Sequence, residues 1–187
     1  MRTRSTVVAL GMGLLGAVPL AAQTARARPV TMGNDALIRE AMSAAPREIA
    51  ENATVLAPAL DGGMRELRKG TNGWTCMPDS PDTPGKDPMC LDAQGMQWAM
   101  DWHAGKERPT NTAPGLAYML AGGSDVSAND PWAKPDESTK FIASPPHYMV
   151  LWPFTKESGL SDQPKKTGTW IMWAGTPYAH LMVNQTP

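Results

Sequence analysis

Cys76 and Cys90 are the only cysteines among the 187 residues of the chain, and their spacing constrains its fold more than any other feature. A segment rich in proline and aspartate, residues 78–89, separates them. A disulfide between them would close a loop of about fifteen residues, which the chain-entropy model values at roughly 3 kcal/mol. We expect this bond to tie the strand that ends at Cys76 to a helix that follows Cys90.

The first residues have the parts of a secretory signal peptide. Arg2 and Arg4 precede the uncharged segment 7–22, and residues 25–27, Ala-Arg-Ala, supply the small-x-small pattern at which signal peptidase cuts. The apolar segment contains a proline and is shorter than the ~20 residues that span a bilayer. We therefore expect residues 1–27 to be removed, leaving a periplasmic or secreted chain with no stable membrane anchor, in a compartment that permits disulfides.

Removal of this signal peptide leaves fourteen basic residues against eighteen acidic ones, a net charge near −4. Nucleic acids and anionic lipid surfaces select basic patches, so the charge argues against a nucleic-acid partner. About 160 residues remain, enough for one well-packed domain and too few for two ordinary ones. We expect residues 28–187 to form a single domain.

Hydrophobic periodicity predicts an α+β fold. We expect an antiparallel sheet of about five to seven strands, two or three helices and one disulfide. Residues 124–146 show no periodicity, and a connection of that length is either a functional loop or contains an undetected element. The expected helices are residues 36–45, 46–51 and 92–105, and the expected strands are 54–57, 64–68, 73–77, 116–120, 148–152, 170–173 and 178–183.

Two histidines and an aspartate are candidate catalytic residues. His147 begins an expected strand, and His180 belongs to the expected terminal hairpin. If these strands are neighbours, the imidazoles could meet beside Asp125 and form an acid/base set or a metal site with two histidines and one carboxylate. This pattern leaves a hydrolytic enzyme, metal-assisted or not, open as an alternative function, and no recognised catalytic motif accompanies it.

A second candidate set lies on the expected helix 92–105. Met96, Met100 and His103 are spaced at i, i+4 and i+7, so they share one helical face. Thioethers with an imidazole suit Cu(I), whereas methionine is also a common filler of cores. The pattern therefore leaves copper or other metal handling in the periplasm open as an alternative function; no other cofactor is predicted.

Seven tryptophans suggest a third kind of site, because indole rings can stack on sugars or aromatic ligands. Trp132 lies on the long segment 124–146, and we predict it as a ligand-binding residue together with Tyr118 and Ser124. The function we favour from the sequence is a non-catalytic module that binds a small molecule or a protein partner.

Five short stretches resemble a family of exported bacterial proteins without an assigned activity. They are GTNGWTC at residues 70–76, DPMC at 87–90, YML at 118–120, GGSD at 122–125 and GTPYAH at 175–180. The resemblance covers most of the mature chain and implies a bacterial source and a periplasmic or secreted location. It implies no reaction and assigns no functional residue.

Overall fold

The computed structural model describes residues 32–59, 62–81, 83–154 and 156–185. The signal peptide expected at residues 1–27 lies outside the described residues. Residues 32–187 cluster as one unit by their internal contacts. Within the described ranges, no helix is both long and apolar enough to cross a membrane.

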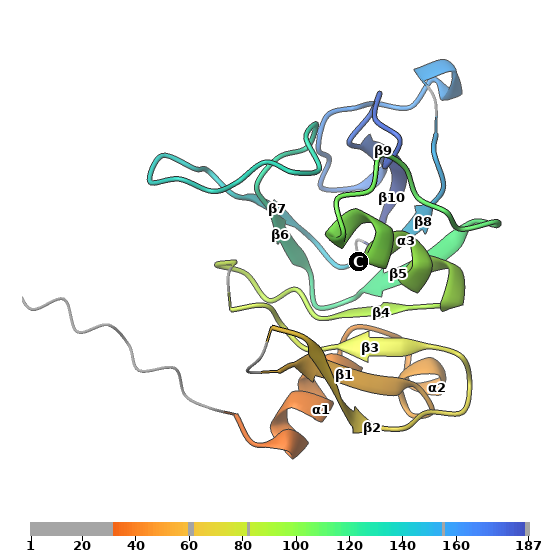
Figure 1. The fold of residues 1–187 in the computed structure, drawn as a ribbon. Helices are drawn as coiled ribbons and strands as arrows, with labels where there is room; N and C mark the ends of the chain where they lie inside the picture. The colour runs from red at the N-terminus through yellow and green to blue at the C-terminus, as the bar shows by residue number, and fades with distance from the viewer. Residues whose placement is uncertain (1–31, 60–61, 82, 155, 186–187) are drawn as a thin grey trace, which may run out of the picture. The chain divides into compact units, whose positions relative to one another are not determined.

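Eight strands form one sheet in the order β2-β1-β3-β4-β5-β8-β10-β9, and β6 pairs with β7 in a second, two-stranded sheet (Figure 1). Three α-helices and one short 3-10 helix complete the described elements. The strands are β1 Thr54–Pro58, β2 Met64–Arg68, β3 Thr75–Met77, β4 Met89–Leu91, β5 Gly115–Met119, β6 Gly123–Asp125, β7 Ile142–Ser144, β8 His147–Leu151, β9 Gly168–Met172 and β10 His180–Asn184, and the helices are α1 Asn34–Met42, α2 Arg47–Ala50, α3 Ala93–His103 and η1 Lys156–Ser158.

The α+β class is confirmed, but the expected strand number and the purely antiparallel sheet are wrong. The main sheet alone has eight strands, and it is mixed because β1 and β3 run parallel. The segment 124–146, expected to be a functional loop or to contain an undetected element, holds β7 and most of β6, and β4 was missed. Each of these three strands has three residues, too few for an alternating pattern to be recognised.

The disulfide between Cys76 and Cys90 is confirmed, but its expected position between a strand and a helix is wrong. Cys76 of β3 and Cys90 of β4 are directly opposite partners in an antiparallel pair, with Cα atoms 4.0 Å apart. Both are fully buried, and the Cys90 sulfur lies 3.6 Å from the carbonyl oxygen of Ala41 in α1. The bond therefore links two adjacent strands within the sheet, beneath α1.

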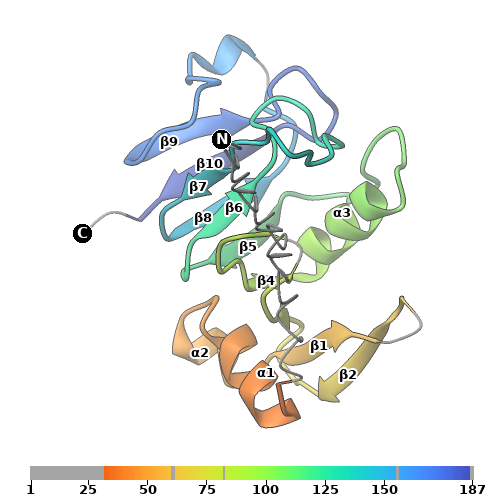
Figure 2. The same ribbon diagram turned by 90° about the vertical axis from the view of Figure 1, so that its left-hand side faces the viewer.

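The main sheet has a helix on each side, as Figure 2 shows. Side chains alternate between the two faces of a strand, so neighbouring residues enter different cores. One core joins α1 and α2 to the cysteine face of the sheet, and the other joins α3 to the opposite face. Cys90 belongs to the first core and Leu91, its neighbour in β4, to the second.

Two glycines allow α3 to approach the sheet closely. A Cβ atom on Gly95 would lie 2.8 Å from the carbonyl oxygen of Leu116 in β5, and one on Gly115 would lie 2.4 Å from the Gly95 nitrogen. The helix begins at Asp92, as predicted, whose Oδ1 accepts a hydrogen bond of 2.7 Å from the Gly95 amide. These contacts fix the start of α3 against β5.

Buried Asp101 fixes the other end of α3. Its carboxylate accepts hydrogen bonds from the Thr110 amide (2.6 Å) and from Gln97 Nε2 (3.0 Å), and it pairs with the Lys106 ammonium. Burial alone would raise the pKa of Asp101, but the bonds from Lys106, Thr110 and Gln97 together hold this pKa well below its ordinary value. The helix is thus held at both ends over the sheet.

Candidate ligand-binding cavity

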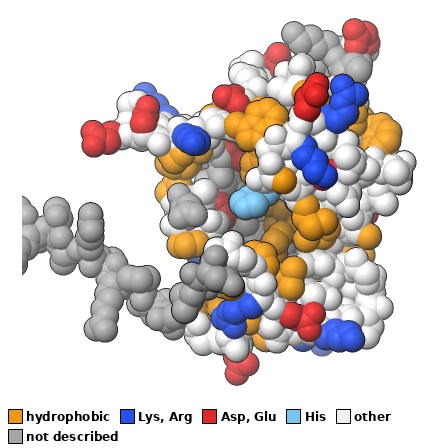
Figure 3. All heavy atoms as spheres, in the orientation of Figure 1, with side chains coloured by type: hydrophobic (Ala, Val, Ile, Leu, Met, Phe, Trp, Pro, Cys, Tyr) orange, Lys and Arg blue, Asp and Glu red, His pale blue; other side chains and the backbone are white. Residues whose placement is uncertain are grey.

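A cavity of about 770 Å³ lies between α3 and the face of the main sheet against which α3 packs. Strand β6 and the segment that follows β3 also line it. The space-filling view shows a hollow in the surface, with apolar side chains around it and a histidine at its rim (Figure 3). His103 is the exposed histidine of the three. The described lining contains nine methionines, namely Met64, Met77, Met89, Met96, Met100, Met119, Met149, Met172 and Met182.

The sheet supplies most of these methionines because they occupy equivalent positions on neighbouring strands. Met77 is paired with Met89, and Met149 is paired with Met182. Met119, at the end of β5, is paired with His147. Residues paired across adjacent strands project from the same face, so these side chains form one continuous surface. We call this surface the methionine floor.

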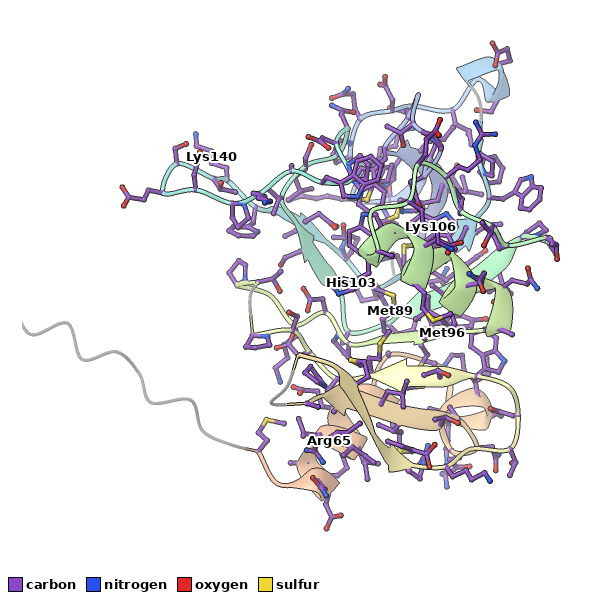
Figure 4. The ribbon with its side chains drawn as sticks, in the orientation of Figure 1. Arg65, Met89, Met96, His103, Lys106 and Lys140 are labelled. Atoms are coloured by element: carbon purple, nitrogen blue, oxygen red, sulfur yellow. A yellow bond between two sulfur atoms is a disulfide. The ribbon has the colours of Figure 1, made fainter. Side chains whose placement is uncertain are left out.

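The helix α3 forms the opposite wall of the cavity. Met96, Met100 and His103 all line it, and Met100 is 52% exposed at its mouth. Figure 4 labels Met89 of β4 together with Met96 and His103 of α3, and all three line the cavity. The structure thus brings the predicted copper set to the cavity, and binding of Cu(I) there stays a prediction.

Three tryptophans close one part of the cavity around His180. Trp98 stacks on Trp173, with ring centroids 5.9 Å apart and ring planes 5° apart. The His180 ring meets both indoles edge-on, with centroid distances of 5.3 Å to Trp98 and 5.0 Å to Trp173. Trp102 packs 5.2 Å from Trp173. This arrangement gives the cavity a rigid aromatic wall.

The indole N–H groups of this wall have different environments. Trp102 donates to the carbonyl oxygen of Pro131 at 2.8 Å, and Trp173 donates to that of Ser127 at 3.0 Å. These two bonds attach the segment after β6 to α3 and to the end of β9. Trp98 Nε1 is buried and has no hydrogen-bond partner among the described residues.

Both buried histidines are neutral hydrogen-bond acceptors toward the cavity. His147 Nδ1 lies 2.7 Å from the Pro145 carbonyl oxygen, and His180 Nδ1 lies 3.0 Å from that of Tyr178. A carbonyl only accepts, so each Nδ1 carries the proton and each Nε2 carries a lone pair. Burial lowers the pKa of His147 and lowers that of His180 to about 4, which keeps both rings uncharged at neutral pH.

Asp125 of β6 lines the cavity close to the segment between β3 and β4. Burial, with a smaller contribution from the charge of Asp87, raises the pKa of Asp125 to about 7. Asp87 accepts from the Ser80 amide at 3.2 Å and from the Thr83 hydroxyl, and its own amide donates to Asp79 at 2.8 Å. Asp79, Asp87 and Asp125 all line the cavity.

A close contact holds this acidic segment against β6. A Cβ atom on Gly85 would lie 2.0 Å from the Ser124 hydroxyl oxygen, a distance that only glycine permits. Ser124 itself lines the cavity, and its role as a ligand-binding residue stays a prediction. The segment closed by the disulfide therefore forms one side of the cavity.

The predicted catalytic residues His147, His180 and Asp125 all line this one cavity, but the two histidines lie at opposite ends of the β8–β10 pair. His147 is paired with Asn184, four residues from His180, so the two histidines are separated by about 13 Å along the strand direction at the usual rise. Among the described residues, no group of three or more His, Cys, Asp and Glu side chains is arranged to hold a metal ion.

Two of the three predicted ligand-binding residues lie elsewhere. Tyr118 projects from the cysteine face, where its ring packs 5.6 Å from that of Trp74. Trp132 is 45% exposed and packs against Tyr178, whereas its neighbours Pro131 and Ala133 line the cavity. The sequence reasoning missed the methionine floor, although thirteen methionines, most of them on strands or on α3, were the available signal.

No protein-family model matches the chain, and neither a curated protein nor a solved structure matches it. The chemistry of the cavity is therefore the remaining indication of function. Its described lining combines nine methionines, three tryptophans, three histidines and four aspartates, and contains no lysine or arginine.

Proposed function

We propose that this protein is a binding module that holds a small, largely apolar molecule in the methionine-lined cavity. The observation that carries the proposal is the cavity itself. Its volume of about 770 Å³ falls within the range of small-molecule sites, and such sites are typically apolar with a few polar groups that orient the ligand. Flexible thioethers adapt to ligands of different shape, which suits a lining of this composition.

An exported location is part of this proposal. The buried Cys76–Cys90 disulfide supports it, since stable disulfides are typical of periplasmic and secreted proteins. The signal-peptide pattern of residues 1–27 supports it from the sequence side. A binding module in this compartment would take up its ligand before the ligand reaches the cytoplasm, or after it leaves.

A second candidate function is acid/base catalysis by Asp125 with His147. It is favoured by one observation, the pKa of about 7 of an aspartate that lines a cleft. It ranks second because the hydrogen bonds of the described residues include none between Asp125 and either buried histidine. Hydrolysis of 4-nitrophenyl octanoate that is lost in Asp125→Asn would favour the enzyme over the binding module.

The binding proposal is tested with N-phenyl-1-naphthylamine, an uncharged apolar dye that fluoresces strongly when it leaves water. Titration of the mature, disulfide-bonded protein with the dye is expected to give saturable binding. Ala99→Phe places a ring in the cavity, because Ala99 lines it, and is expected to abolish or strongly weaken dye binding.

The matched control is Ala93→Phe, in the same helix. Ala93 is exposed and is not part of the lining, so this variant is expected to bind like the wild type. Circular dichroism and thermal melting verify that both variants are folded. Absence of saturable binding to the wild type, or equal loss in both variants, would refute the proposal.

A further inference from the structure

The described lining of the cavity contains carboxylates and no lysine or arginine. Neutral His147 and His180 present the lone pairs of their Nε2 atoms, because each Nδ1 donates to a backbone carbonyl. Asp79, Asp87 and Asp125 add carboxylate oxygens, and carboxylates accept only when ionised. Both histidines are at least 98% buried, so these lone pairs have little access to bulk water.

Several donors of the lining already have partners, whereas the buried Trp98 Nε1 has none among the described residues. The Thr83 hydroxyl donates to Asp87, and the indoles of Trp102 and Trp173 donate to backbone carbonyls. The described lining contains no lysine or arginine that could supply a positive charge. The carboxylates of the lining form their stronger hydrogen bonds with charged donors, so a bound molecule that brings a positive charge gains from this cavity.

We propose that the ligand is a primary amine, with its ammonium group at the Asp125 end of the cavity and its apolar body along the methionine floor. This inference rests on the proposed function and specifies the chemical class of the ligand. An ammonium group carries three N–H donors and a positive charge, and it therefore matches a lining of carboxylates and unprotonated imidazole nitrogens.

The geometry of β6 places the ammonium position. A Cβ atom on Gly123 would lie 3.5 Å from His147 Cε1 and 3.0 Å from the terminal methyl of Met119. Asp125 is two residues further along the same strand and so projects from the same face as Gly123. The Met119 methyl and the His147 ring thus pack against Gly123, and Asp125 and His147 both line this end of the cavity.

The remaining length of the cavity suits an apolar chain. From His147 the floor continues through Met149 and Met182 to His180, which is enclosed by Trp98 and Trp173. The titratable groups that face the proposed ammonium position are Asp87 and Asp79 from the segment before β4, His147 from β8, and, toward the mouth, His103 and Asp130. The carboxylates among them attract a cation, and burial keeps the pKa of His147 low, so its ring is neutral and does not repel one.

The test compares three molecules with the same eight-carbon chain: octylamine, 1-octanol and octanoate. Each is titrated against the complex of the mature protein with N-phenyl-1-naphthylamine at about pH 8, where the amine is charged. Octylamine is expected to displace the dye at a concentration about tenfold or more below that of 1-octanol, since hydrogen bonds to charged groups are the stronger ones. Octanoate is expected to be the weakest.

Asp125→Asn keeps the size of the side chain and removes its charge. It is expected to reduce the preference for octylamine over 1-octanol to about twofold or less, because the amide no longer attracts the ammonium charge. Asp162→Asn removes the same charge from an exposed position away from the cavity and is expected to keep the full preference.

The outcomes separate this inference from the proposed function. If 1-octanol binds as well as octylamine, or octanoate binds best, the amine proposal is wrong and the binding module stands. If the dye and all three probes fail to bind, both are wrong. If Asp162→Asn and Asp125→Asn lose the preference equally, the effect is one of overall charge and the assigned position is wrong.

Discussion

Met149 of β8 and Met182 of β10 lie directly opposite each other on the face of the sheet that lines the cavity. Met149 is 6% exposed and Met182 is 1% exposed, so both belong to the core as well as to the cavity floor. His147 and His180 follow at the two ends of this pair of strands. The methionine side chains of the floor therefore contribute both to the stability of the sheet and to the shape of the cavity.

Truncation of this floor is expected to destabilise the protein. Met149→Ala removes buried atoms from the core and should lower the free energy of unfolding by about 2–4 kcal/mol. Met149→Leu keeps the volume and should cost less than about 1.5 kcal/mol. Urea unfolding followed by tryptophan fluorescence measures both values, and equal stability of the two variants would contradict a packed floor.

Loss of the disulfide is expected to lower stability by about 3 kcal/mol, because the unfolded chain gains the freedom that the closed loop removes. The double variant Cys76→Ala/Cys90→Ala tests this by urea unfolding without reductant. Dithiothreitol should shift the unfolding midpoint of the wild type and leave that of the double variant unchanged. A wild type that is insensitive to reduction would show that the bond contributes little.

Asp101→Asn is expected to destabilise the protein by about 1–3 kcal/mol, because Lys106 loses its partner and the buried network loses its charge. The pKa of Asp101 is lower in the folded state than in the unfolded state, so its contribution is present above the unfolded pKa of about 4 and is lost as the pH falls through the folded pKa. The difference between wild type and variant in urea unfolding should therefore shrink as the pH falls below about 4. A difference that is independent of pH would assign the effect to packing alone.

Asp125 is expected to have the opposite effect on stability. Its pKa is about 7 in the folded state against 3.8 for the unperturbed group, so between these values the folded state holds a proton that the unfolded state has lost. The free energy of unfolding therefore falls as the pH rises through this window. At about pH 8, Asp125→Asn should be more stable than the wild type by about 1–3 kcal/mol, and at about pH 4 the two should be alike.

At each pH the free energy of unfolding is measured for wild type and variant together, because His180 also changes the stability with pH. The pKa of His180 is lowered to about 4, so its contribution to stability falls as the pH drops below about 6.5, the value in the unfolded chain. This contribution is common to both proteins and cancels in the difference. A stability difference that does not grow between about pH 5 and pH 8 would show that Asp125 is ionised in the folded state at neutral pH.

The sequence by itself determined the local features: the disulfide partners, the three helices with the Asp92 cap, and the hairpins β1–β2 and β9–β10. These depend on residues that are near in the chain, whose periodicity and turn residues act over a few positions. The export signal belongs to the same group and stays a prediction, because residues 1–27 lie outside the described residues.

Only the tertiary structure decided the site. The pairing of β5, β8 and β10 joins segments that are distant in the chain, and it alone places their methionines on one face. The strand that holds Asp125 has three residues and carries too little pattern to be placed, so the segment from residue 124 was left open as a loop or an undetected element. Periodicity indicates which face a residue occupies within its own strand, whereas the register between distant strands determines which residues share a cavity.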